Sequence, residues 1–170
     1  MQINLTDYSK LYISARYWLL GMAEHDPRYF EVLDAMDWAK THHNGLRNGG
    51  QPAFIHQLGI FHRMRTLRNH LKNPAMVLML VFLHDIVEDA TTVEENGVKV
   101  KKYVSPEEVK ARYGEEVMHK VLKLSKEIQG QPNPNYSLKA VFEDEDCGPA
   151  KLGDRDNNVA EVVLNWNLFN

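Results

Sequence analysis

The stretch PAMVLMLVFLHDIVED, residues 74–89, is the most informative part of this chain. From Pro74 to Leu83 it is apolar at every position, and Asn73 before Pro74 is a typical helix start. A helix that is apolar nearly all round is expected to be buried on several sides. The sequence therefore predicts a central helix over residues 74–88, against which the remaining elements pack.

Other helices are predicted on both sides of this stretch, where apolar residues recur at spacings of three and four. They are expected over about residues 29–39, 54–71, 109–128, 141–146 and 149–166. Asp26 before Pro27 is a further predicted N-cap, and Ser105 before Pro106 adds a capping box with Glu108.

A short β-hairpin is predicted between the helices. Residues 94–104 contain Asn96-Gly97, a typical hairpin turn, and Val98, Val100 and Tyr103 alternate after it. The expected fold class is all-α with this one small β excursion.

The composition is that of a single ordinary domain over residues 1–170, with 44% hydrophobic and 25% charged residues. A net charge of -3 gives no basic surplus for nucleic acid. The single cysteine, Cys147, excludes an intramolecular disulfide and cysteine-rich zinc modules. No signal peptide and no membrane-length apolar run is visible. We expect a cytoplasmic protein without nucleic-acid or membrane partners; its oligomeric state stays open, a homo-oligomer included.

Asp85 is the first residue that indicates a functional site, because this carboxylate follows directly after the apolar stretch that is expected to be buried. A buried carboxylate costs several kcal/mol unless it is paired or bound to a cation, and carboxylate and imidazole are standard metal ligands. Glu88 and Asp89 lie four residues after His84 and Asp85, so each pair shares a helical face if the helix continues. Two interpretations follow: the acids gather around a metal ion, or the helix ends near His84 and they are a solvated terminus.

Two other polar groups lie far away in the sequence. One runs from His42 and His43 to His56, and the other from Lys151 to Asn158. A lone histidine on a helix is more often a satisfied core residue than a ligand, and adjacent histidines are common in loops. Neither group indicates a site by itself, but each supplies side chains that are able to join His84.

Taken together, these groups resemble the hydrolase domain of RelA/SpoT homologues and the small alarmone hydrolases. These HD-superfamily enzymes degrade the alarmones ppGpp and pppGpp. Three blocks carry the resemblance: AKTHHNGLRNGGQPAFIH (39–56), FLHDIVED (82–89) and AKLGDRDNN (150–158). They occur in the family's order, and the similar region runs from about residue 29 to 158. The resemblance implies an HD-type helical bundle.

The resemblance also implies a metal site. By similarity, one divalent cation, usually manganese in this family, would be held by His56, His84, Asp85 and Asp154. Two imidazoles and two carboxylates leave positions for water and substrate, as a catalytic metal site requires.

Further roles are implied around the metal. Glu88 and Asp89 match the acidic pair that positions and deprotonates the attacking water, with Glu88 expected to be the nearer. Arg47 matches the residue that stacks on the purine ring. Lys151 and Asn158 match positions that line the nucleotide site. Arg155 is open to two interpretations, a structural ion pair or a contact with the substrate.

The implied reaction is hydrolysis of the 3′ diphosphate of ppGpp, which gives GDP and pyrophosphate. Residues that depart from the family's pattern near the expected nucleotide site include Asn48, Ala53 and Asp156. They keep two alternatives open. The substrate is another nucleotide, such as an adenine alarmone, the 2′-phosphate of NADPH or a deoxynucleoside triphosphate, or the chain is a non-catalytic nucleotide sensor.

Overall fold

The computed structural model describes residues 5–47 and 50–164. Within them the chain forms seven α-helices, one 3-10 helix and two small hairpins. The α-helices are α1 (Leu5–Ala23), α2 (Arg28–His42), α3 (Ile55–Met64), α4 (Pro74–Leu83), α5 (Pro106–Leu124), α6 (Leu138–Glu143) and α7 (Cys147–Leu164). The remaining elements are η1 (Arg65–His70), β1 (Thr91–Glu95), β2 (Val98–Lys102), β3 (Glu127–Ile128) and β4 (Gln131–Pro132). The all-α prediction with a short β excursion is confirmed at this level.

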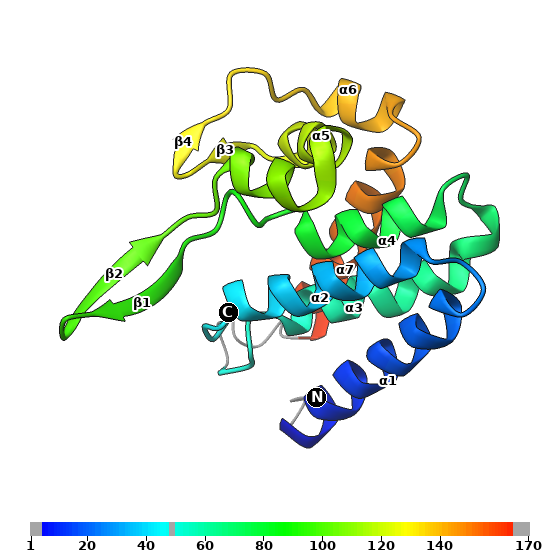
Figure 1. Cartoon of the computed structure of the whole chain (residues 1–170), viewed down its shortest axis with the longest axis horizontal. Coiled ribbons are helices and arrows are strands. Elements are labelled where there is room, and N and C mark those ends of the chain that lie inside the picture. Colours follow the sequence, from blue (N-terminus) through cyan, green and yellow to red (C-terminus); the bar gives the residue numbers. More distant parts are fainter. Residues whose placement is uncertain (1–4, 48–49, 165–170) are drawn as a thin grey trace.

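Helix α4 lies at the centre of the helices, as predicted (Figure 1). Every residue from Val77 to Leu83 is buried, and the helix packs against α2, α3, α5 and α7. Its predicted N-cap is confirmed, because Asn73 accepts a hydrogen bond from the Met76 backbone N–H at 3.4 Å. Burial on all sides explains why this helix shows no polar face.

The core around α4 is aromatic on the side of α3. The Phe61 ring stacks on Phe82 with centroids 5.1 Å apart and meets the edge of Trp18 at 5.6 Å. Trp18 belongs to α1, a helix that none of the predicted elements covers. Helix α1 closes the core by packing on α2 and α3.

Several predicted boundaries are wrong for local reasons. The helix expected over residues 109–128 ends at Leu124 and is interrupted at Gly114, whose φ of 88° is incompatible with a helix. The capping box between Ser105 and Glu108 is present at its start. Asp26, however, does not cap α2, and its carboxylate instead accepts hydrogen bonds from the backbone N–H and guanidinium of Arg28. The last helix begins at Cys147, and Trp166 lies outside the described residues.

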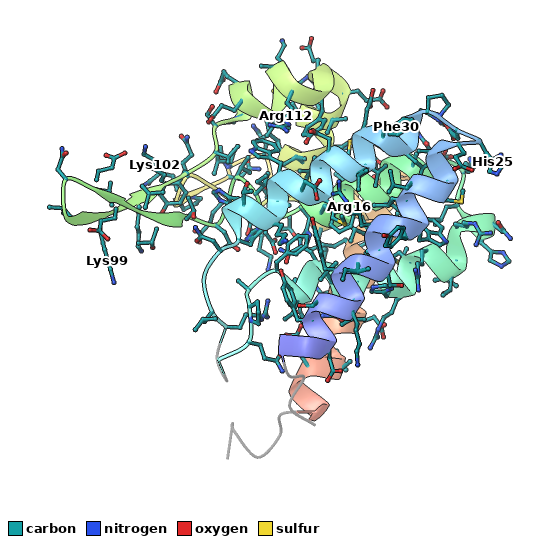
Figure 2. The ribbon with its side chains drawn as sticks, turned by 60° about the horizontal axis from the view of Figure 1, so that its bottom comes forward. Arg16, His25, Phe30, Lys99, Lys102 and Arg112 are labelled. Atoms are coloured by element: carbon teal, nitrogen blue, oxygen red, sulfur yellow. The ribbon has the colours of Figure 1, made fainter. Side chains whose placement is uncertain are left out.

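The predicted hairpin is present and runs from Thr91 to Lys102. Asn96 and Gly97 form its turn, with φ values of 53° and 78°, as a two-residue turn between antiparallel strands requires. The hairpin projects away from the helices as an arm, on which Lys99 and Lys102 lie (Figures 1 and 2). Among the described residues, no helix combines the length and the apolar character needed to cross a membrane.

A charged cluster fixes the junction between α6 and α7 and joins it to α5. Asp144 Oδ1 accepts the backbone N–H groups of Asp146 and Cys147, both at 3.0 Å. Its carboxylate also pairs with Lys123 at 2.7 Å and Lys120 at 3.2 Å. Burial acts to raise the pKa of Asp144, but Lys123 and these N–H groups hold it well below its usual range.

We expect Asp144→Asn to lower the free energy of unfolding by about 1.5–3 kcal/mol at pH 7, the range for hydrogen bonds to a charged group. Because the pKa is depressed in the folded protein, the charged form stabilises the fold above the unfolded-state pKa of about 3.9. The difference between wild type and variant should therefore shrink as the pH falls below about 4. Urea denaturation at several pH values measures it. Glu143→Gln, at an exposed carboxylate nearby, is the control and should change little. A difference that grows at acid pH would contradict this account.

Candidate metal centre

Four side chains from three parts of the chain meet beside the end of α4. His56 is the second residue of α3, His84 and Asp85 directly follow α4, and Asp154 lies on α7. One ligand atom each from His56, His84 and Asp85 lies within 4.8 Å of the other two. Asp154 Oδ1 lies 3.2 Å from His56 Nε2 and 3.8 Å from His84 Nε2. The predicted metal ligands are thus brought together.

His84 is oriented for binding a cation. Its Nδ1 lies 2.9 Å from the backbone carbonyl of Val81, which accepts only, so Nδ1 carries the proton of that hydrogen bond. Its Nε2 forms an ion pair with Asp85 Oδ2 at 2.7 Å, but this contact lacks the geometry of a hydrogen bond, so the buried nitrogen makes no hydrogen bond to the described residues. Buried polar atoms are rarely left without a partner. A metal ion is one group that would satisfy this nitrogen, so the donor set fits a divalent cation.

The electrostatics of the site favour positive charge. Burial acts to lower the pKa of His84, but Asp85 and Asp154 raise it to about 9. Burial acts to raise the pKa of Asp85, but His84 lowers it to about 2. The pKa of Asp154 is also held below its usual range, by His56, His84 and Lys151 against the effect of burial. Carboxylates kept ionised in a buried site are suited to holding a cation.

The α-helix ends at Leu83 and turns follow it, although His84 itself keeps helical backbone angles, so the predicted helix over residues 74–88 ends five residues early. Asp85 O accepts the backbone N–H of Glu88 at 3.0 Å and that of Asp89 at 2.9 Å, which closes tight turns. The expectation that His84 and Glu88 share a helical face is therefore wrong. The segment is not a solvated terminus either, because Ile86 is fully buried.

The acidic pair lies beside the cluster in two different environments. Glu88 is half-buried and accepts the backbone N–H of Lys126, whereas the Asp89 side chain is 60% exposed. Burial, and next the charge of Asp85, raise the pKa of the Glu88 carboxyl group. A carboxylate with a raised pKa is a better proton acceptor near neutral pH, which suits a general base.

The residues that were predicted to bind the substrate differ in their burial and in the side chains that they contact. Lys151 is buried, with its Nζ 3.0 Å from Asp154 Oδ2, and Asn158 donates to Asp154 Oδ1 at 2.7 Å. Both therefore hold a predicted metal ligand in place. Arg47 is about one-third exposed and pairs with Glu161 at 2.9 Å. Arg155 is exposed and forms no ion pair within the described part of the chain, so the structural ion pair considered for it is not seen.

Three residues near the site were not among the predicted site residues. Asn157 and Glu161 lie three and seven residues after Asp154, so they share its face of α7, and this spacing was the available signal. Glu161 Oε1 lies 3.1 Å from His56 Nδ1. His43, interpreted as a loop histidine, is buried with its Nδ1 3.5 Å from Asp89 Oδ2, and no described group bonds its Nε2.

Two of the departures from the family's pattern lie on described residues. Ala53 is half-buried, two residues before the start of α3. Asp156 lies on the outer side of α7, where it pairs with Arg63. Asn48 lies outside the described residues.

Comparison with known proteins assigns no relationship, because no family model and no curated protein matches this chain.

We expect the protein to bind Mn²⁺ and His84→Ala to weaken this binding by more than about 100-fold, beyond the 10–100-fold typical of partners outside the ligand shell. The reason is that this substitution removes one of the four proposed metal ligands, which are clustered in a buried site. Isothermal titration calorimetry with Mn²⁺ measures it. His119→Ala, at an exposed histidine on α5, is the matched control and should bind as the wild type does. Equal affinity in His84→Ala would show that the ion binds elsewhere.

Proposed function

We propose that this protein is a metal-dependent phosphohydrolase of the HD superfamily. We further propose that its substrate is a guanosine alarmone, ppGpp or pppGpp, which it converts to GDP or GTP and pyrophosphate. The observation that carries the proposal is the meeting of His56, His84 and Asp85, with Asp154 within 3.2 and 3.8 Å of the two imidazoles. The sequence resemblance assigns a metal to the same four residues.

His56, His84, Asp85 and Asp154 would hold the divalent cation, and the resemblance points to Mn²⁺. When bound, a cation of this kind supplies Lewis-acid chemistry, which makes water a better nucleophile at neutral pH and offsets charge on the leaving group. A cation also explains how a protein with a net charge of -3 would attract a polyanion.

Glu88 is the proposed general base, with Asp89 as its partner. Its carboxylate is fixed by the Lys126 backbone N–H, and the pKa of the group is raised by burial and by Asp85. A fixed carboxylate of this kind removes a proton from water more readily than an exposed one does. Asp89 lies next to it in sequence but is more exposed and faces His43.

Arg47 is the proposed nucleotide-binding residue. Its guanidinium is partly exposed, and a planar guanidinium stacks on a purine ring or forks around a phosphate. Lys151 and Asn158 are proposed to line the same site while they hold Asp154. The HD-type bundle belongs to this proposal: α3, the end of α4 and α7 carry the ligands, as the resemblance implies.

The direct test incubates the Mn²⁺-loaded protein with ppGpp and pppGpp and measures pyrophosphate and nucleotide products by mass spectrometry. A parallel panel contains an adenine alarmone, NADPH and deoxynucleoside triphosphates. Turnover of ppGpp alone supports the proposal in full. Turnover of a different nucleotide would support the proposed phosphohydrolase activity but would show that a guanosine alarmone is not the substrate. Tight nucleotide binding without any turnover would instead indicate a sensor.

We expect Glu88→Gln to lower kcat for ppGpp hydrolysis by about 10²–10⁴-fold, the contribution typical of general acid–base catalysis. The amide keeps the size of the side chain but does not accept the proton. Mn²⁺ affinity, measured by calorimetry, should stay within about threefold of wild type, because Glu88 is not among the proposed ligands. Glu116→Gln, at an exposed position on α5, serves as the control. A Glu88→Gln enzyme with wild-type kcat would remove Glu88 from the mechanism.

A further inference from the structure

His56 lies between two carboxylates, one at each ring nitrogen. Asp154 Oδ1 lies 3.2 Å from Nε2, and Glu161 Oε1 lies 3.1 Å from Nδ1. The side chains of His56 and Asp154 are almost fully buried, whereas that of Glu161 is 30% exposed. Glu161 is therefore placed behind the ring, on the side away from the other proposed ligands.

Two side chains approach Nδ1 of His56, Glu161 Oε1 at 3.1 Å and Asn157 Nδ2 at 3.0 Å. Glu161 acts as an acceptor here, because Arg47 donates to its Oε2 and Asn157 donates to its Oε1. An amide NH2 only donates, so the two contacts at Nδ1 are alternatives, and a cation on Nε2 selects the one in which Nδ1 donates to Glu161. With its proton on Nδ1, a neutral imidazole turns the lone pair of Nε2 towards Asp154 and His84, where a metal would bind.

The two proposed imidazole ligands are held in different ways. His84 Nδ1 donates to the backbone carbonyl of Val81, an acceptor that no side-chain substitution removes. His56 Nδ1 faces a side-chain carboxylate, that of Glu161, at 3.1 Å. A carboxylate acceptor makes the imidazole a stronger ligand than a neutral carbonyl does, because it stabilises positive charge on the ring.

Glu161 is itself fixed on two sides. Asn157 Nδ2 donates to Glu161 Oε1 at 2.7 Å, and Arg47 donates to Glu161 Oε2 at 2.9 Å. Asn157 packs tightly on α3, since a Cβ at Gly59 would lie only 2.6 Å from its Oδ1. The carboxylate therefore has a defined position, and it contacts both a proposed metal ligand and the proposed nucleotide-binding residue.

We propose that Glu161 is a positioning residue of the metal centre, which orients His56 through Nδ1 and joins this ligand to Arg47. The inference rests on the proposed function, because it requires that His56 binds a metal. As a consequence, one carboxylate outside the proposed ligand set contacts both a metal ligand, His56, and the nucleotide-binding residue, Arg47. Loss of the negative charge of Glu161 should weaken the binding of the metal ion, although all four proposed ligands remain.

The test is calorimetric titration of the purified full chain with Mn²⁺ alone, in the absence of nucleotide. We expect Glu161→Gln to bind Mn²⁺ about tenfold more weakly than wild type and Glu161→Ala more weakly still, within the 10–100-fold range of such outer partners. Glutamine keeps an acceptor oxygen at the same reach but loses the charge. The matched control is Asp156→Asn, which removes a carboxylate that pairs with Arg63 on the outer side of the same helix. This variant should bind Mn²⁺ as wild type does.

A second comparison separates the metal effect from the loss of an ion pair. Glu161→Gln leaves Arg47 without its carboxylate, which lowers stability by itself. In the double variant Arg47→Gln/Glu161→Gln both charges are removed, and Mn²⁺ should still bind about tenfold more weakly than in Arg47→Gln alone. This comparison applies even if Glu161→Gln folds poorly.

The outcomes distinguish the two proposals. A wild-type protein that binds no Mn²⁺ overturns the proposed metal centre, and the role of Glu161 falls with it. Wild-type binding together with unchanged affinity in Glu161→Gln overturns the role of Glu161 alone and leaves the proposed function standing. An equal loss of affinity in Asp156→Asn also overturns it, because the effect would then belong to α7 as a whole.

Discussion

The structure depends on how it accommodates charge at the end of its most buried helix. Helix α4 is enclosed on all sides, and the chain that leaves it begins with His84 and Asp85. Ionised groups in such a place are costly unless opposite charge meets them. Here His84 contacts Asp85 at 2.7 Å, and Asp154 reaches the same space from α7. A buried, balanced cluster of imidazoles and carboxylates is therefore built into the core.

The elements around α4 are arranged so that this cluster is held firmly. Helix α3 delivers His56 from its first turn, and α7 places Asp154, Asn158 and Glu161 on one face. Lys151 and Asn158 each bond Asp154, so the family-like block on α7 acts here as a support for a proposed ligand. The same packing that stabilises the fold thus sets the geometry of the site.

Sequence patterns predicted the parts that depend on local chemistry. Full apolarity located α4, Asn96-Gly97 located the hairpin turn, and the three blocks selected His56, His84, Asp85 and Asp154, which the fold brings together. What depends on tertiary contacts was not predicted. The turns that follow His84 form inside the core, where Ile86 and Val87 are fully buried, and no glycine or proline marks them. The role of Glu161 depends on the approach of α3 to α7, which the periodicity of α7 alone does not reveal.

The central claim is that one cation is enclosed by four side chains. It is tested most directly by a crystal structure of the protein grown or soaked with Mn²⁺, using anomalous scattering near the manganese edge. We expect one strong anomalous peak within about 2.0–2.2 Å of nitrogen atoms of His56 and His84 and carboxylate oxygens of Asp85 and Asp154, the range for such ligands in tight divalent-metal sites. Crystals that bind Mn²⁺ only at other residues, or that show no peak between these side chains at saturating Mn²⁺, would contradict it.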